Sequence, residues 1–187
     1  MLRLDGTAST RTGMADNLHQ MTAEYVPAQD RILFRVNTQE KLEYRVWLTR
    51  RVVKNLWGVA VKSFEAKPEV VEQARPQVKQ AVMSMQHQQA VQSSNFGQKH
   101  DTSTTPAPDA DTPLLAVATQ IQEVNENLLR LTFVTAERKA VNLHLTQDML
   151  HAICHIVQTA ADRAGWDLQL AVGDAASVMQ TEVGQVH

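Results

Sequence analysis

The residues best suited to chemistry lie close together near the end of the chain. Asp148, His151 and His155 are spaced i, i+3 and i+7, so a helix would place them on one face, away from its apolar stripe. Histidines at i and i+4 can chelate a transition metal, with the aspartate as a third ligand and Cys154 nearby. No H-E-x-x-H or C-x-x-C motif accompanies them. We therefore expect no metal and no cofactor, and keep Asp148, His151 and His155 as a weak metal-site candidate.

A second group of candidate residues is basic and aromatic, and it belongs to the first half of the chain. Residues 31–54 contain seven Lys or Arg and two Glu, a local charge of +5 in a chain whose net charge is −2. Alternation along the predicted strands places four side chains on the sheet face opposite the core. These are Arg31, Arg35, Arg45 and Trp47, and the matching face in the second half of the chain includes His144.

This basic face allows three interpretations. Arginines beside an exposed aromatic ring on a sheet can hold phosphates while a base stacks on the ring. Trp and Arg are also enriched at the hot spots of protein interfaces. The plainest interpretation is a solvated face whose cations pair with Glu43 and its neighbours, with Trp47 covered by another segment. Several phosphate contacts ordinarily need a more positive surface than a chain of net charge −2 provides.

Catalytic motifs are missing from the sequence. It contains no G-x-S-x-G, no Gly-rich phosphate loop and no pair of carboxylates on a recognisable scaffold. Seven glycines are few for a nucleotide-binding enzyme. The single cysteine, Cys154, excludes a disulfide within the chain and is expected to be a half-buried residue at the edge of the core. We therefore predict that the protein is not an enzyme.

The elements that must position these residues form a strand–strand–strand–helix unit in the first half of the chain. Residues 18–26 read as a strand, and apolar and polar residues alternate over 31–37 and 42–48, with turn-forming residues between the three segments. Thr49 has the side chain of a helix N-cap, because its hydroxyl can accept a free amide of the first turn. Helical spacing of apolar residues follows over 50–64.

The second half of the chain repeats this order, with Thr146 as the matching N-cap before a helix over 147–164. Residues 32–57 align with residues 129–154 without a gap, and four pairs are identical while nine core positions coincide. We predict an α+β fold built from duplicated β-β-β-α units, related by a pseudo-twofold axis, in one or more antiparallel sheets covered by helices. The alternative is two unrelated units that share a generic pattern.

A Gln-rich segment over 67–94 contains prolines at positions typical of helix starts, and it predicts an additional central helix with a thin apolar stripe. On the helix before it, Trp57, Val61 and Phe64 are spaced i, i+4 and i+7 and widen the apolar face. We expect the central helix to cover these three residues; the alternative is that they form a dimer interface.

The domain organisation follows from composition. A linker rich in Pro, Ser and Thr divides the chain, and it is expected to be flexible or an extended strap. The predicted parts are a disordered tail at 1–16, the first unit with the central helix at 17–94, the linker at 95–113, and the second unit and tail at 114–187.

The bulk composition is that of a globular protein, with 43% hydrophobic and 20% charged residues. The first residues contain no apolar region of a secretory signal, and no stretch approaches the roughly 18 apolar residues of a membrane span. These features predict a soluble cytoplasmic protein that does not bind membranes.

The segment Glu43–Arg51 (EYRVWLTRR) resembles one that recurs in a family of uncharacterised bacterial proteins. In that family it precedes a helix, a second helix rich in Gln and Ala, and a Pro-rich linker. The resemblance implies a bacterial origin and a self-contained fold, and it assigns no site. The topology is loosely similar to the Whirly and PUR-type single-strand binders, which have four strands per unit where three are counted here; this is an analogy of fold alone.

Two function hypotheses follow. The first is a non-catalytic protein-interaction or assembly module, which binds a protein partner or a second copy of itself. The alternative is a binder of single-stranded nucleic acid that uses Arg31, Arg35, Arg45 and Trp47.

Overall fold

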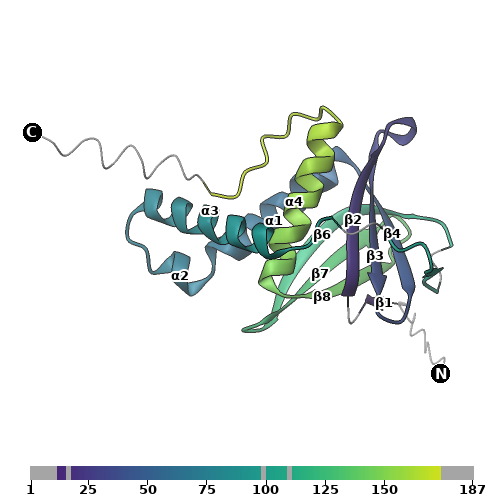
Figure 1. Cartoon of the computed structure of the whole chain (residues 1–187), viewed down its shortest axis with the longest axis horizontal. Helices are drawn as coiled ribbons and strands as arrows, with labels where there is room; N and C mark the ends of the chain where they lie inside the picture. The colour runs from purple at the N-terminus through teal and green to yellow at the C-terminus, as the bar shows by residue number, and fades with distance from the viewer. Residues whose placement is uncertain (1–11, 16–17, 98–99, 109–110, 174–187) are drawn as a thin grey trace, which may run out of the picture.

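The computed structural model describes residues 12–15, 18–97, 100–108 and 111–173 of the 187-residue chain (Figure 1). Its strands are β1 (Thr12–Ala15), β2 (Leu18–Val26), β3 (Arg31–Thr38), β4 (Leu42–Leu48), β5 (Thr105–Pro106), β6 (Leu114–Asn125), β7 (Leu128–Thr135) and β8 (Ala140–Leu145). Its helices are α1 (Arg50–Glu65), α2 (Pro68–Val71), α3 (Pro76–Ser93) and α4 (Gln147–Arg163), with a short 3-10 turn η1 (Pro27–Gln29).

One mixed sheet runs through the described part of the chain, in the order β1-β8-β7-β6-β4-β3-β2, with β5 paired to β4 off this path. The triplets β2–β3–β4 and β6–β7–β8 are antiparallel, whereas the junctions β4–β6 and β8–β1 are parallel. The α+β class is confirmed, and the expected antiparallel sheet is corrected to a mixed one. The helical segment between β4 and β6 returns the chain to the end of the sheet at which β4 begins. β6 therefore runs in the same direction as β4.

The two triplets have the same internal register. Ile32 pairs with Leu48 in the first, and Leu129 pairs with Leu145 in the second. Their second turns also agree: the hydroxyls of Thr38 and Thr135 each accept a hydrogen bond from the amide four residues later, at 3.2 and 3.1 Å. The structure therefore contains the same strand–strand–strand–helix arrangement twice, as the sequence alignment predicts.

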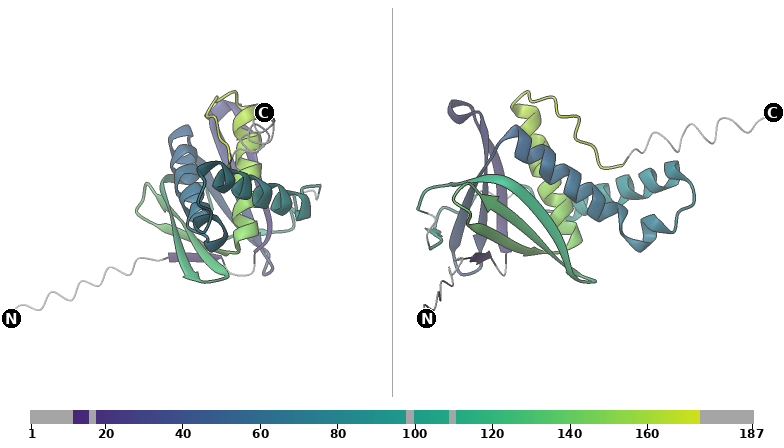
Figure 2. Two further views of the ribbon diagram at one scale, coloured as in Figure 1. Left: turned by 90° about the vertical axis from the view of Figure 1, so that its left-hand side faces the viewer. Right: turned by 180° about the vertical axis from the view of Figure 1, so that it is seen from behind.

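Helices α1 and α4 begin at the predicted threonines. The hydroxyls of Thr49 and Thr146 each accept a hydrogen bond from the amide three residues later, at 3.3 Å. Both helices lie side by side against one face of the curved sheet, and α2 and α3 extend beyond it (Figure 2). Each helix packs mainly on the other unit, α1 against β6 and α4 against β2.

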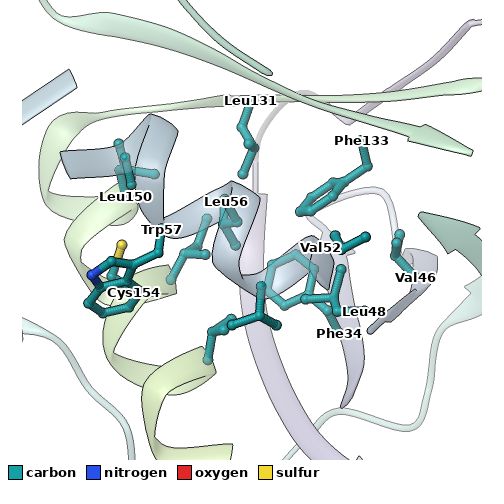
Figure 3. Close-up of a cluster of buried hydrophobic side chains, with 14 of the residues drawn as sticks. Phe34, Val46, Leu48, Val52, Leu56, Trp57, Leu131, Phe133, Leu150 and Cys154 are labelled. Atoms are coloured by element: carbon teal, nitrogen blue, oxygen red, sulfur yellow. The ribbon is translucent and has the colours of Figure 1, made fainter. Parts of the chain in front are cut away.

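The core lies between the sheet and these two helices, and both units contribute to it (Figure 3). The rings of Phe34 and Phe133 lie 5.7 Å apart, measured between centroids. Leu56 of α1 and Leu150 of α4 are fully buried in the same cluster. The two units therefore share one core.

The tail predicted at the start of the chain needs one correction. Residues 12–15, which the sequence places in a disordered tail, form β1 and pair in parallel with β8. A short strand at a sheet edge is held by backbone hydrogen bonds, so its side chains need no apolar alternation. The rest of the predicted tail, and the chain after residue 173, lie outside the described residues.

The proposed dimer contact of Trp57, Val61 and Phe64 is also corrected. Trp57 and Phe64 are buried in the core and Val61 is partly buried against it. The indole nitrogen of Trp57 donates to the carbonyl oxygen of Ala171 at 3.0 Å, so the segment after α4 covers this side chain. These residues are used inside the chain and cannot form a surface for a second copy.

Candidate functional site

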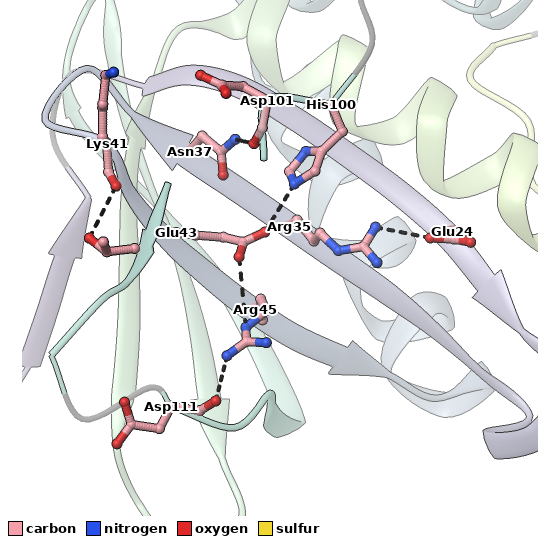
Figure 4. Close-up of polar contacts among 10 residues, drawn as sticks. Glu24, Arg35, Asn37, Lys41, Glu43, Arg45, His100, Asp101 and Asp111 are labelled. Atoms are coloured by element: carbon pink, nitrogen blue, oxygen red, sulfur yellow. Dashed lines mark hydrogen bonds and ion pairs between the residues drawn. The ribbon is translucent and has the colours of Figure 1, made fainter. Parts of the chain in front are cut away.

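Part of the predicted linker, residues 100–108, pairs with the edge of β4 and lies over one end of the basic face predicted on β3 and β4; we call these residues the strap (Figure 4). The amides of Thr105 and Ala107 donate to the carbonyl oxygens of Lys41 and Glu43, both at 2.9 Å. Asn37, which is 1% exposed, donates its side-chain amide to the carbonyl oxygen of Asp101 at 3.1 Å. The linker is therefore a strap over this sheet face along these residues.

The charged side chains of the basic face have partners within the chain. Arg35 forms an ion pair with Glu24 at 2.9 Å. Glu43 lies between Arg45 and His100, at 3.9 and 3.1 Å (Figure 4). Arg45 also donates to the backbone oxygen of Asp111. This agrees with the interpretation in which the cations of this face pair with Glu43 and its neighbours.

The other predicted members of the face are less closely grouped. Arg31 and Trp47 are half-buried, and Trp47 lies between Leu33 and Leu115 on the neighbouring strands. His144 lies on β8, three strand spacings or about 14 Å from β4. It receives a hydrogen bond from Arg130 at 3.4 Å. The structure therefore does not bring His144 together with Arg45.

The weak metal candidate is corrected. His151 is 2% exposed and its ring stacks on Phe64 with 3.8 Å between centroids, so it points inward and not to solvent. Its Nδ1 atom lies 3.2 Å from Nδ1 of His87 on α3. Asp148 is exposed, and His155 packs against Phe96 instead. No group of three or more His, Cys, Asp or Glu side chains in the described ranges is arranged to hold a metal ion.

The inward position of His151 has a physical cause that the sequence pattern concealed. The helix α4 is covered on two sides, by the sheet and by α3, so its buried face is wider than one apolar stripe. Burial, together with the neighbouring His87, lowers the pKa of His151 to about 4. The neutral pair therefore links α3 to α4 by one hydrogen bond.

Cys154 is fully buried, deeper than the half-buried position expected. Burial raises the pKa of its thiol to about 12. A thiol that stays protonated is a poor nucleophile, so this residue serves packing.

A groove of about 550 Å³ lies between β2 and α4, and we call it the β2–α4 groove. All six consecutive residues from Leu18 to Ala23 line it. Successive side chains of a strand point to opposite faces, so a wall made of consecutive residues is the edge of the strand. Within the described part of the chain β2 pairs with β3 alone, and this edge is the unpaired one.

The opposite wall of the groove is one face of α4. Its lining residues recur along the whole helix, and Met149, Ala152 and Ile156 give it an apolar centre. Ser93, the last residue of α3, and residues 94–96 after it close one side of the groove. Phe96 is 42% exposed and its ring lies 4.8 Å from that of His155, so an apolar surface reaches the groove mouth.

The strand and the helix that form the groove run in the same direction. At one end Trp166, just after α4, donates its indole N–H to Asp30, just after β2, at 3.0 Å. The ring of Tyr25 meets that of Trp166 edge-on at 6.0 Å. Figure 1 shows both elements ending on the same side of the molecule. The groove is therefore about as long as the six-residue stretch of β2 beside it, roughly 20 Å.

Sequence reasoning did not find this groove. Its apolar residues read as ordinary core positions, because half-buried Met21, Met149 and Ile156 follow the same periodicity as buried ones. Whether a strand lies at the edge of a sheet depends on the order of the strands in that sheet. The alternation of apolar and polar residues does not contain this information. The one available signal was the exposed aromatic Phe96 after a Gln-rich helix.

Comparison of the chain with family models, curated proteins and solved structures finds no match. The resemblance seen over Glu43–Arg51 stays a prediction. None of the helices in the described ranges is long and apolar enough to cross a membrane.

Proposed function

We propose that the protein is a peptide-binding module that accepts an extended segment of a partner protein in the β2–α4 groove. The observation that carries this proposal is the run of six consecutive β2 residues whose unpaired edge opens onto an apolar helix face. In this mode, called β-strand addition, backbone hydrogen bonds supply much of the affinity and pockets between side chains supply specificity.

The chemistry of the groove suits such a ligand. An unpaired strand edge presents backbone N–H and C=O groups that another extended chain can pair with. The facing wall offers apolar contacts from Met149 and Ile156, which would cover alternate side chains of the added strand. No covalent chemistry is needed, in keeping with the prediction of a non-catalytic interaction module.

The nucleic-acid alternative stays a prediction that gains no support here. Its two central arginines, Arg35 and Arg45, already form ion pairs, and the strap lies over one end of the same face. A phosphate would have to compete with these contacts and displace the strap.

The proposal is tested by selecting phage-displayed random peptides against the full chain and measuring the affinity of the selected peptides by fluorescence anisotropy. Ile156→Lys places a charge in the apolar wall of the groove. An unpaired charge buried against apolar surface costs more than about 1.4 kcal/mol, so the peptide affinity is expected to fall at least about tenfold. Thr159→Arg fills the same groove without removing an apolar residue, so it separates lost binding from lost folding.

The matched control is Val117→Lys, which changes a 39%-exposed valine on β6 that does not line the groove. It is expected to leave the affinity unchanged. Hydrogen exchange supplies the structural readout, because an added strand protects β2 amides that face the groove. Selected peptides that bind Ile156→Lys and Thr159→Arg as tightly as the original chain, or that protect another part of the sheet, would show the proposal to be wrong.

A further inference from the structure

We propose that the β2–α4 groove selects extended segments with an acidic residue toward their N-terminal end, an apolar middle, and a basic residue toward their C-terminal end. This inference rests on the proposed function and adds the direction and charge pattern of the ligand. It comes from two charged residues at opposite ends of the groove wall.

Asp148 and Arg163 are the two lining residues that carry a formal charge at neutral pH when histidine is neutral. Both are exposed, and neither forms an ion pair with another of the described residues. They belong to the first and last turns of α4, fifteen residues apart, which corresponds to about 22 Å along the helix. Seven residues of an extended chain span about the same length.

The middle of the groove favours uncharged side chains. Between the two charges the helix wall presents Met149, Ala152 and Ile156, and the strand wall presents Met21 and Ala23. A charged group placed there would lose water without gaining a partner. The ligand charges are therefore expected at its ends.

The direction of the ligand follows from the direction of β2. Because β2 and α4 run parallel, Asp148 lies toward the beginning of β2 and Arg163 lies toward its end. Antiparallel pairing is somewhat more stable per residue than parallel pairing. A ligand antiparallel to β2 starts beside Arg163 and ends beside Asp148. Its acidic residue then meets the guanidinium, and its basic residue meets the carboxylate.

Two seven-residue peptides with blocked ends test this inference. One has the order Glu-Thr-Val-Thr-Val-Thr-Lys, in which alternation places Glu, both Val and Lys on the side that faces α4. The other has the two charged residues exchanged. Fluorescence anisotropy with the full chain at low salt is expected to show about fivefold tighter binding of the first peptide, since two exposed ion pairs contribute modestly. Added salt is expected to reduce the difference, because exposed pairs are screened.

Variants of the two charged residues give the decisive comparison. The double change Asp148→Lys and Arg163→Glu is expected to reverse the preference, and Asp148→Asn with Arg163→Gln is expected to remove it. The neutral pair guards against helix destabilisation by a lysine in the first turn of α4. A thermal melt of each variant checks the fold.

The outcomes separate this inference from the proposed function. Equal binding of both peptides, with binding still lost in Ile156→Lys, overturns the charge pattern and leaves the groove as a binding site. Tighter binding of the exchanged peptide overturns the antiparallel direction. Failure of both peptides and of all selected peptides to bind overturns the proposed function and this inference together.

Discussion

At the scale of single residues, the buried histidine pair is the feature with the clearest consequence. His87 and His151 place two Nδ1 atoms 3.2 Å apart between α3 and α4. One ring must donate a proton and the other must accept it, so the contact needs at least one neutral ring. A second proton would put two positive charges against each other in a largely buried place.

The stability of the protein is therefore expected to fall as the pH falls from about 6.5 to about 4. The pKa of His151 is about 4 in the folded protein, and burial also lowers the pKa of His87. Histidine in an unfolded chain titrates near 6.5, so between these values the unfolded state binds more protons and gains stability as pH falls. For His151 alone the loss amounts to at most about 3 kcal/mol. Urea unfolding at a series of pH values measures it.

The matched variants for this prediction are His151→Phe and His19→Gln. Phenylalanine keeps a ring against Phe64 but cannot titrate, so its unfolding free energy is expected to vary less between pH 6.5 and 4. His19 is exposed, and its replacement is expected to leave the profile as it was. An equally steep profile in His151→Phe would contradict the assignment to this pair.

At the scale of elements, the strap shows how a polar segment becomes ordered. Its composition offers almost nothing to bury, yet backbone amides of Thr105 and Ala107 pair with β4, and Asp101 satisfies the amide of buried Asn37. The strap is held mainly by backbone hydrogen bonds to an edge of β4 that is otherwise unpaired there, and less by the burial of apolar side chains. Composition reports only apolar side chains, so it predicts a flexible segment.

Replacing residues 100–108 by an equally long Gly/Ser segment is expected to destabilise the protein by about 1–3 kcal/mol. A Gly/Ser segment keeps the backbone carbonyl that Asn37 binds, but it loses more conformational entropy on ordering and lacks the buried Ala107 and the contact of His100 with Glu43. The segment is therefore expected to detach and leave the buried side chain of Asn37 without a partner, which costs about that much. Urea unfolding measures the loss, and Asn37→Val in the replaced chain is expected to recover part of it. Unchanged stability would mean that the strap contacts contribute nothing.

The same scale explains what the sequence could and could not predict. The repeated strands, both threonine N-caps and the prolines that begin α2 and α3 follow from local patterns, and the structure confirms them. The parallel pairing of β4 with β6 depends on Val46 and Trp47 meeting Leu114 and Leu115, more than sixty residues apart. No local pattern encodes that choice of partner.

The candidate site shows the same division. The pattern of a single helix predicts His151 on the solvent face, and this is wrong because α3 covers that side of α4. The groove was missed because it depends on which strand lies at the sheet edge. In both cases the burial of the side chains depends on contacts between distant segments, which the local sequence pattern does not contain.

At the scale of the whole molecule, the two units are repeated in form but not independent in structure. Each helix leaves its own unit and packs on the first strand of the other, α1 on β6 and α4 on β2. Asn55 of α1 accepts hydrogen bonds from the amide and the hydroxyl of Thr119 on β6, both at 2.7 Å. Each helix therefore packs on the sheet mainly through strands of the other unit.

This exchange predicts that the halves fold only together. Residues 1–97 expressed alone lack β6 and α4, so Phe34 and Leu56 lose the partners Phe133 and Leu150 in the shared core. Burial of a large apolar side chain contributes roughly 1.5–3 kcal/mol, so losing several such contacts exceeds the 5–15 kcal/mol by which a domain is stable. The isolated half is expected to show no cooperative thermal unfolding by circular dichroism.

Mixing residues 1–97 with residues 98–187 is expected to restore a cooperative transition, because the break follows exposed Gly97, between α3 and the strap. The control is the mixture carrying Phe133→Ala, which removes the ring that meets Phe34 at 5.7 Å and should weaken the association. A first half that unfolds cooperatively by itself would show that the strands need no helix from the other unit, and the exchanged packing would then be incidental to folding.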